Sequence, residues 1–499
     1  MSVSPMIVAG TMFVGRQEQL ARLDKLLRRV RSDDDRKPGK ALLIRGRRRV
    51  GKSRLVEEFV ETCGVPHVFF AASGRPVREE LRLFAEEVAA SDLPAAALFE
   101  GIELTSWDAA LRQLASVLPD DGSVVVLDEI PFMIAADDGF EGSLQRSFDR
   151  ELSKKRVLLI GVGSDLAMME ALNSYGRPFH QRASEMVVPP LTPHEVATML
   201  DLGAADAFDA FLVTGGLPLI CSEWSAGASL WDYLAEACAD PTSAMLVSAE
   251  RSLAAEFPAD LQARAVLNAI GSGERTFTNI GRAAGGLQQT SLSRSLKLLT
   301  DKRVVAVDEP ISSKPSKDKR YRVADSYLRF WLSFLGPYIP EIERGRGDRV
   351  MARIRTSWTT WRGRAIEPVI RDALGRLAPN VTRMPDGAPG VVGGYWTRTN
   401  NPEIDLVVAD RAPVAKQITA LGSIKWLENS PFDSHDLGVL HGHRLKLPGA
   451  APDTPLLAVS RSGVAVDGVT ALGVEELLQA YIPGDPQDPK MDVPDGASV

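Results

Sequence analysis

A phosphate-binding loop is the clearest chemical signal in the chain. Its residues are Gly46-Arg47-Arg48-Arg49-Val50-Gly51-Lys52-Ser53, which match G-x-x-x-x-G-K-[ST] at each fixed position. Glycines in such a loop let successive N–H groups face phosphates at the start of a helix. We expect Lys52 to reach the β- and γ-phosphates and the Ser53 hydroxyl to bind Mg²⁺. An apolar run precedes the loop and an amphipathic helix follows it, so ATP with Mg²⁺ is the expected ligand.

Two carboxylates at the end of another apolar run supply the expected partner of this loop. Asp128 and Glu129 follow Val124 to Leu127. We expect Asp128 to join Ser53 around Mg²⁺ and Glu129 to polarise the attacking water. Many strands end in Asp-Glu, and it is the loop upstream that makes this pair specific.

The segment before the loop shows a family resemblance. Phe13-Val14-Gly15-Arg16 resembles the opening box of the AAA+ and STAND-type P-loop ATPases. The resemblance implies that Val14, Gly15 and Arg16 lie beside the adenine. Leu158 to Ser164 is similar to the next core strand of that superfamily, which implies that Ser164 senses the γ-phosphate. The other role open to Ser164 is that of a helix N-cap.

The same resemblance implies further site residues. Arg177 and Arg182 are candidates for an arginine that completes the transition state, within the chain or from a neighbouring subunit. Surface ion pairs are the alternative for both. The segment that ends in Pro218 resembles the signature of a helical lid, whose proline would lie over the nucleotide. Val50 and Arg54 complete the expected nucleotide contacts.

A helix-turn-helix pattern occupies residues 261–303. Three short apolar faces surround a Gly285-Gly286 turn, and strands are expected at 304–307 and 321–323. A basic segment, 314–320, joins those strands and is expected to be a flexible wing.

Basic residues outnumber acids around this wing. Residues 290–322 hold nine Lys and Arg against four Asp and Glu, in a chain of net charge −7. This excess indicates contacts with the phosphates of duplex DNA. The expected contacts are Lys314, Lys317, Lys319 and Arg320 of the wing, and Gln288, Gln289, Ser291, Arg294 and Lys297 of the recognition helix. The alternative is a rigid connector that packs on the ATPase core.

The aromatic segment Tyr321 to Trp331 resembles a signature of archaeal-type STAND ATPases, which implies a C-terminal domain like the PD-(D/E)XK nucleases. In that fold, carboxylates hold Mg²⁺ and a lysine supports the attacking water. The matching residues are Glu367, Asp405 and Lys425. Ser423 stands where the second acid belongs, and a hydroxyl cannot replace a carboxylate as a strong Mg²⁺ ligand. DNA cleavage is therefore not expected.

Other polar residues of the C-terminal region are further candidates for this degenerate nuclease site. Glu403 and Glu428 are candidates to compensate for the missing acid. His435, His441 and His443 have no acid or cysteine at ligand spacing, so we interpret them as loop histidines.

The expected fold class is α/β: a P-loop AAA+-like parallel sheet with a helical lid, a winged helix-turn-helix and a C-terminal α/β restriction-endonuclease-like domain. Short apolar runs that alternate with helical patterns predict the parallel sheet. The expected domains are an ATPase core (11–190), a lid (191–250), a winged helix (251–325), a connector (326–355), a nuclease-like domain (356–482) and a disordered tail (483–499).

Composition limits the remaining possibilities. The 499 residues are too many for a single core, and no apolar run is long enough to span a membrane. Cys63, Cys221 and Cys238 are scattered, which excludes a disulfide scaffold and fits a reducing cytoplasm. A GTPase is disfavoured because an Asn/Thr-Lys-x-Asp segment is missing.

The predicted function is a slow ATPase switch whose nucleotide state is coupled to DNA binding. The alternatives are a signalling scaffold that binds a protein partner or assembles as a homo-oligomer, and an ATP-controlled DNA nuclease.

Overall fold

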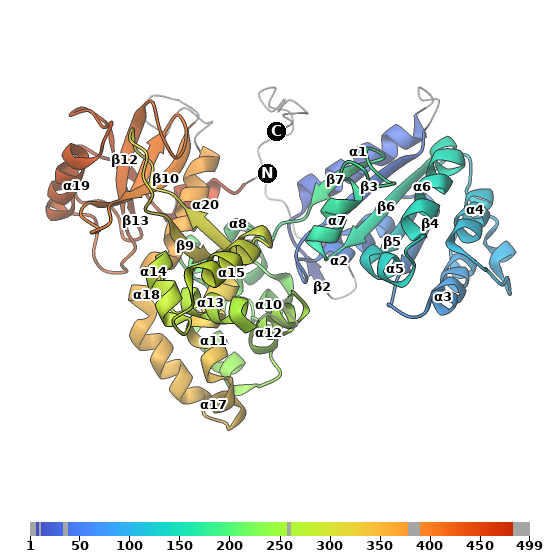
Figure 1. The fold of residues 1–499 in the computed structure, drawn as a ribbon, viewed down its shortest axis with the longest axis horizontal. Helices are drawn as coiled ribbons and strands as arrows, with labels where there is room; N and C mark the ends of the chain where they lie inside the picture. Colours follow the sequence, from blue (N-terminus) through green and yellow to red (C-terminus); the bar gives the residue numbers. More distant parts are fainter. Residues whose placement is uncertain (1–5, 9–10, 33–37, 257–260, 378–389, 483–499) are drawn as a thin grey trace. The chain divides into compact units, whose positions relative to one another are not determined.

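The structure, a computed structural model, describes residues 6–8, 11–32, 38–256, 261–377 and 390–482. The tail expected at 483–499 lies outside these residues. The chain divides into two units (Figure 1). The first contains residues 13–190 and 217–219, and the second contains 191–216 and the chain from 220 onward. A two-stranded sheet of β1 (Met6–Val8) and β2 (Thr11–Phe13) precedes them.

A five-stranded parallel sheet forms the centre of the first unit, in the order β4-β5-β6-β3-β7. The strands are β3 (Lys40–Arg45), β4 (His67–Ala71), β5 (Ser123–Asp128), β6 (Val157–Gly163) and β7 (Ala183–Val187). Every residue of β5 and β6 is buried, as expected for central strands covered on both faces. The parallel sheet predicted from the apolar runs is confirmed.

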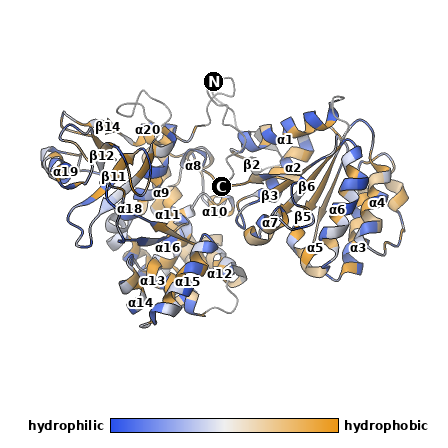
Figure 2. Ribbon diagram, turned by 45° about the horizontal axis from the view of Figure 1, so that its top comes forward, coloured by the Kyte–Doolittle hydropathy of each residue, from blue (hydrophilic) through white to orange (hydrophobic). Residues whose placement is uncertain are grey.

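Helices cover both faces of this sheet. One face packs against α1 (Gln17–Arg31) and α2 (Lys52–Thr62). The other carries a core from α3 (Val77–Ala90), α4 (Trp107–Val117) and α6 (Phe140–Arg150). Figure 2 shows the strands between these layers as mainly hydrophobic. The remaining helices are α5 (Ile130–Ala136), α7 (Leu166–Leu172), η1 (Ala96–Phe99) and η2 (Leu152–Lys154).

The predicted lid corresponds to five helices of the second unit, of which α10 begins in the first unit. They are α8 (Pro193–Leu200), α9 (Ala204–Thr214), α10 (Pro218–Cys221), α11 (Leu230–Ala239) and α12 (Ala244–Glu256). Phe208 and Leu212 of α9 belong to the core of the C-terminal sheet. The segment 191–216 therefore packs with the C-terminal part of the chain, because the apolar face of α9 is buried there.

Three helices and a hairpin follow in the predicted order. They are α13 (Leu261–Gly271), α14 (Phe277–Ala283), α15 (Gln289–Asp301), and the antiparallel pair β8 (Val305–Asp308) and β9 (Arg320–Val323). We call residues 309–319, between the two strands, the wing segment.

Residues 311–313, which precede the predicted wing of 314–320, are bound to the C-terminal domain, and the last residue of that predicted wing, Arg320, belongs to β9. The N–H groups of Ile311, Ser312 and Ser313 donate to the carbonyls of Gly394, Pro413 and Pro448, at 2.9, 3.3 and 2.9 Å. Ile311 is buried in the core of that sheet. Lys314 and Lys317 remain exposed.

The predicted connector, 326–355, is instead part of the helical core. Tyr327, Phe330 and Trp331 of α16 (Ser326–Phe334) are buried. After η3 (Gly336–Tyr338) and α17 (Ile339–Glu343), the 31-residue helix α18 (Gly347–Leu377) runs through the expected boundary at 355.

A mixed five-stranded sheet, β10-β11-β12-β13-β14, forms the C-terminal domain. The first three strands are antiparallel and the last two add in parallel. Helices α18 and α20 pack on one face and α19 on the other. The elements are β10 (Val391–Trp396), β11 (Glu403–Ala409), β12 (Ile418–Lys425), α19 (Ser434–Lys446), β13 (Leu456–Ser460), β14 (Thr470–Leu472) and α20 (Val474–Gln479).

None of the helices in the described part of the chain is both long enough and apolar enough to cross a membrane.

Candidate functional site

The phosphate-binding loop joins β3 to α2 at the carboxyl edge of the parallel sheet. Arg49 and Gly51 have φ angles of 67° and 84°, the left-handed region that a tight loop requires. The Lys52 Nζ donates to the carbonyls of Gly46 and Arg47, both at 3.0 Å. Burial lowers the pKa of Lys52 to about 8, although the Glu129 and Asp128 carboxylates oppose this shift.

The order of the strands brings the acidic pair to the loop. Strand β6 lies between β3 and β5, and all three end at the same edge. The Ser53 hydroxyl donates a hydrogen bond of 2.6 Å to Oδ2 of Asp128. Burial raises the pKa of Asp128, and the hydrogen bond from Ser53 opposes it. The Ser53 hydroxyl and the Asp128 carboxylate thus lie side by side, and both are oxygen ligands of the kind that Mg²⁺ prefers.

Ser164 lies at the end of β6, between the loop and the acidic pair. Its hydroxyl donates to both carboxylate oxygens of Glu129, at 2.8 and 3.0 Å. The N-cap of α7 is Asp165, whose side chain accepts from the N–H of Met168. The helix-capping alternative for Ser164 is therefore wrong. Glu129 itself has a left-handed backbone, with φ 52° and ψ 46°.

The predicted opening box also contacts the loop. Arg16 is buried, and its Nη2 donates to the carbonyl of Val50 at 2.8 Å. Gly15 and Arg16 turn the chain into α1 with positive φ angles. Pro218 lies near the other end of the loop, since a Cβ placed on Gly51 would be 3.6 Å from its Cγ.

Three predicted arginines point elsewhere. Arg54 forms an ion pair of 3.0 Å with Glu58, along α2. Arg177 pairs with the buried Glu141 at 2.6 Å.

Arg182 lies at the wrong edge of the sheet for a finger that acts on its own nucleotide. It makes a bidentate pair with Asp149, with bonds of 2.8 and 2.9 Å. Arg182 precedes Ala183 of β7, which pairs with Ala41 near the start of β3. The phosphate-binding loop follows Arg45, at the other end of β3. At about 3.3 Å per residue, these two ends of β3 are ~15 Å apart.

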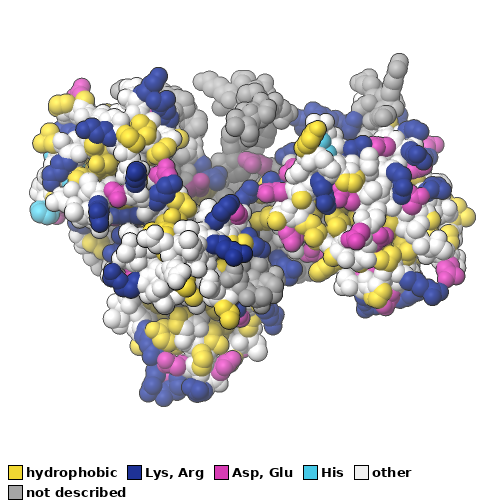
Figure 3. All heavy atoms as spheres, in the orientation of Figure 1, with side chains coloured by type: hydrophobic (Ala, Val, Ile, Leu, Met, Phe, Trp, Pro, Cys, Tyr) yellow, Lys and Arg dark blue, Asp and Glu magenta, His cyan; other side chains and the backbone are white. Residues whose placement is uncertain are grey.

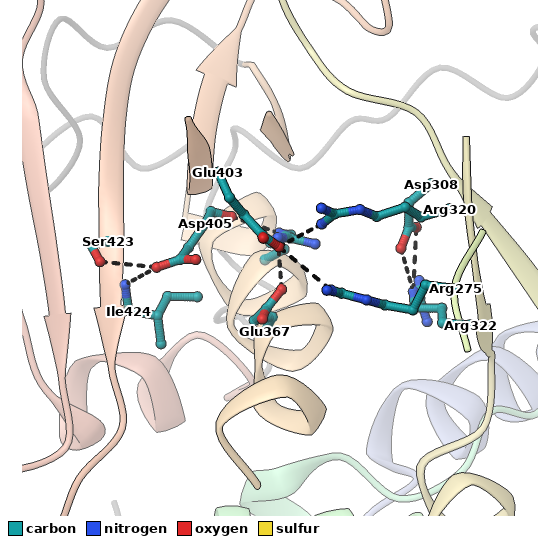
Figure 4. Close-up of polar contacts among 10 residues, drawn as sticks. Arg275, Asp308, Arg320, Arg322, Glu367, Glu403, Asp405, Ser423 and Ile424 are labelled. Carbon is teal, nitrogen blue, oxygen red and sulfur yellow. Dashed lines mark hydrogen bonds and ion pairs between the residues drawn. The ribbon is translucent and has the colours of Figure 1, made fainter. Parts of the chain in front are cut away.

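The C-terminal domain gathers three of its four predicted site residues on one side of the sheet. Asp405 of β11 accepts hydrogen bonds of 2.9 Å from the Ser423 hydroxyl and from the N–H of Ile424 (Figure 4). Lys425 Nζ lies 2.6 Å from Oδ2 of Asp436.

Glu367 of α18, the fourth, is paired with Arg371 at 3.1 Å. Burial raises the pKa of both Glu367 and Asp405, and Arg371 opposes the shift at Glu367.

A small pocket of about 90 Å³ opens beside Asp405 and Ser423. Helix α19 contributes Asp436 and His443, which are seven residues apart and so share one face. All three histidines predicted to lie in loops, His435, His441 and His443, belong to this helix.

Asp436 was missed by the sequence analysis, although its seven-residue spacing from His443 was a usable signal. Within the described residues, no three His, Cys, Asp or Glu side chains lie close enough together to hold a metal ion.

The two glutamates that are candidates to compensate for Ser423 are both paired with arginines, and Glu403 also lines the pocket beside Asp405. Glu403 accepts from Arg320 at 2.6 Å. Glu428 accepts from Arg362 at 2.9 Å. Each carboxylate is paired with an arginine of a different element.

Two protein-family models match parts of the chain. Residues 12–160 match the family described as the AAA ATPase domain. Residues 331–435 match a family described as archaeal and bacterial proteins of unknown function. The first unit thus contains an AAA ATPase-like domain, and the segment that bears Glu367 and Asp405 matches a family without an assigned function.

Individual relatives are distant. An uncharacterized protein of Methanocaldococcus jannaschii is 25% identical over 411 residues, which cover 79% of this chain and 84% of that protein. A Walker-type ATPase of Pyrococcus abyssi is 18% identical, with a TM-score of 0.46, over 64% of this chain and 96% of that chain. The ORC2 protein of Aeropyrum pernix is 13% identical, with a TM-score of 0.43, over 71% of this chain and 96% of that chain.

Proposed function

We propose that this protein binds ATP with Mg²⁺ at the loop of residues 46–53 and hydrolyses it slowly, as a switch of the STAND/AAA+ type. The observation that carries the proposal is the 2.6 Å hydrogen bond between Ser53 and Asp128. It joins the end of the phosphate-binding loop to the acidic pair, across β6. The hydroxyl and carboxylate oxygens are of the type that Mg²⁺ prefers.

Each side chain of the site has a role in this proposal. Lys52, now bonded to loop carbonyls, would bind the β- and γ-phosphates instead. Glu129 would polarise the attacking water, and Ser164 orients its carboxylate. Arg16 holds the loop through the carbonyl of Val50. ATP supplies the phosphoanhydride bond that is broken.

Nucleotide-binding titrations test this function. Lys52→Ala should abolish ATP binding, whereas Glu129→Gln should keep binding and lose hydrolysis. Arg78→Ala is the matched control, because Arg78 lies in the same unit and pairs with Glu103 at the surface. ATP binding by Lys52→Ala at the wild-type affinity would remove the assignment. Competition between ATP and GTP for binding tests whether the site prefers adenine to guanine.

We also propose that α13 to α15 and the β8–β9 hairpin form a winged helix that binds duplex DNA, and that the nucleotide state alters this binding. Figure 3 shows Lys and Arg in several separate groups over the visible face, so a DNA contact must be local. The exposed residues of α15 are suited to a DNA groove, and they are Gln289, Thr290, Ser293, Arg294 and Lys297.

A DNA titration with and without ATP tests this second step. If α15 contacts phosphates, affinity should fall steeply with salt, and Arg294→Ala should reduce the slope by about 0.9 per lost contact. A salt-independent affinity, or none, would favour the scaffold that binds a protein partner. Arg182 stays a candidate only for contact with a neighbouring subunit, and we place the protein in the cytoplasm.

For the C-terminal domain we propose a nuclease-like fold without efficient cleavage. Ser423 stands on β12 in place of an acid and is hydrogen-bonded to Asp405, and Lys425 is paired with Asp436. The site is therefore one acid short on β12. Mg²⁺ sheds its hydration shell reluctantly, so such a site would bind it weakly.

A further inference from the structure

Arg320 of β9, predicted to be a DNA contact, is buried against the C-terminal sheet. Its Nη1 donates to Oε1 of Glu403 at 2.6 Å, and its Nη2 donates to Oδ1 of Asn400 at 2.7 Å. The guanidinium also stacks 4.3 Å over the ring of Trp396. Figure 4 shows Glu403 reaching from β11 toward Arg320 and Arg275, and Arg275 adds a second ion pair at 3.5 Å.

The wing segment is held on the same sheet by an apolar anchor. Ile311 is 3% exposed, and its side chain packs so closely on Gly393 that a Cβ there would lie 2.6 Å from Ile311 Cδ1. Three successive N–H groups, from Ile311 to Ser313, donate to carbonyls of the C-terminal domain. The ion pair and the anchor therefore act at the two ends of one segment.

The basic residues of the wing segment, and Arg320 beside it, differ in whether a carboxylate pairs with them. Arg320 and Lys319 are paired with carboxylates, Glu403 at 2.6 Å and Glu309 at 2.5 Å. Lys314 and Lys317 are exposed. A guanidinium binds carboxylate and phosphate through the same planar set of N–H donors, so Arg320 cannot serve both at once.

We propose that Glu403 is an autoinhibitory docking residue: it occupies the guanidinium of Arg320 in place of a DNA phosphate and keeps the wing segment docked on the C-terminal sheet. In the docked state the winged helix meets DNA through α15 and the exposed lysines. Release of the segment exposes Arg320 and adds a phosphate contact. This inference rests on the proposed DNA-binding function.

Hydrogen–deuterium exchange on the full chain tests the docking without DNA. The amides of residues 311–313 report it directly, because their acceptors belong to the C-terminal domain. Glu403→Gln should raise their exchange, and so should Ile311→Ala, which removes the anchor without changing any charge. Glu475→Gln, at an exposed site in the same domain, should leave their exchange at the wild-type value.

A salt titration of DNA binding tests the inhibition. Glu403→Gln and Ile311→Ala should bind DNA several-fold more tightly than the wild type, with a log–log salt slope steeper by about 0.9 for one added phosphate. Adding Arg320→Ala to Glu403→Gln should cancel both gains. Glu475→Gln, which also removes one negative charge, should change neither.

Each part of the proposal fails in its own way. Unchanged exchange at 311–313 in both Glu403→Gln and Ile311→Ala would overturn the docking. Raised exchange with unchanged or weaker DNA affinity would overturn the inhibition alone. If neither the wild type nor any variant binds DNA, with or without ATP, both the inhibition and the DNA-binding function are overturned.

Discussion

Arg362 of α18 and Asp209 of α9 form a buried ion pair, with 2.9 Å between Nη1 and Oδ2, although they are 153 residues apart in sequence. Arg461 approaches the same carboxylate oxygen at 3.2 Å. Only 1% of the Arg362 side chain and 7% of the Asp209 side chain are exposed. Helix α9, predicted to belong to a lid, therefore binds the C-terminal domain through ion pairs as well as apolar packing.

Removing Arg362 should destabilise the second unit. Arg362→Met leaves the Asp209 carboxylate in a buried site with Arg461 as its remaining partner, at a cost of about 3 kcal/mol. Chemical denaturation followed by tryptophan fluorescence measures this cost. The control is Lys297→Ala, which breaks an exposed pair with Asp301 and should cost below about 0.5 kcal/mol. Equal stabilities of the two variants would contradict the prediction.

ATP affinity should depend on pH through Lys52. Its pKa is lowered to about 8 by burial, so the ammonium is charged below pH 8 and loses its proton above it. Only the charged form attracts the phosphates, so affinity should fall up to about tenfold per pH unit above 8. Calorimetry between pH 7 and 9.5 measures this fall. A flat profile across that range would show that Lys52 is charged throughout.

Ser164 should affect turnover more than binding. Its hydroxyl orients the Glu129 carboxylate and makes no contact with the loop carbonyls that hold Lys52. Ser164→Ala should lower kcat about tenfold, or ~1.4 kcal/mol, with little change in the Kd for ATP. Single-turnover assays beside binding titrations separate the two quantities. A loss of ATP binding with normal turnover of the bound fraction would argue against this role.

The C-terminal site should not cut DNA with Mg²⁺. We expect no cleavage of plasmid or linear DNA, and at most a trace with Mn²⁺, whose ligand demands are looser. Ser423→Glu would place a carboxylate beside Asp405 and should raise activity. Robust Mg²⁺-dependent cleavage by the wild type, lost in Asp405→Ala or Lys425→Ala, would make the protein an ATP-controlled nuclease.

Local signals were sufficient to predict that the first unit contains a parallel sheet. The apolar segments Val124–Leu127 and Leu158–Ser164 correspond to β5 and β6, because buried parallel strands leave short-range patterns in the sequence. Lys52 and Ser53 follow from the motif itself. Their link to Asp128 was also predictable, since parallel strands that end in polar residues bring them to one edge.

Only the tertiary structure determined which ion-pair partners the charged side chains have. Arg182 pairs with Asp149, Arg320 with Glu403, and Glu428 with Arg362. Spacing along the chain carries no information about such pairs, because the partners come from elements 33 to 83 residues away. The sequence by itself determined which elements form and where the phosphate-binding loop lies. Which arginines stay free to meet a phosphate depended on how those elements pack, because a carboxylate of the same chain competes for each guanidinium.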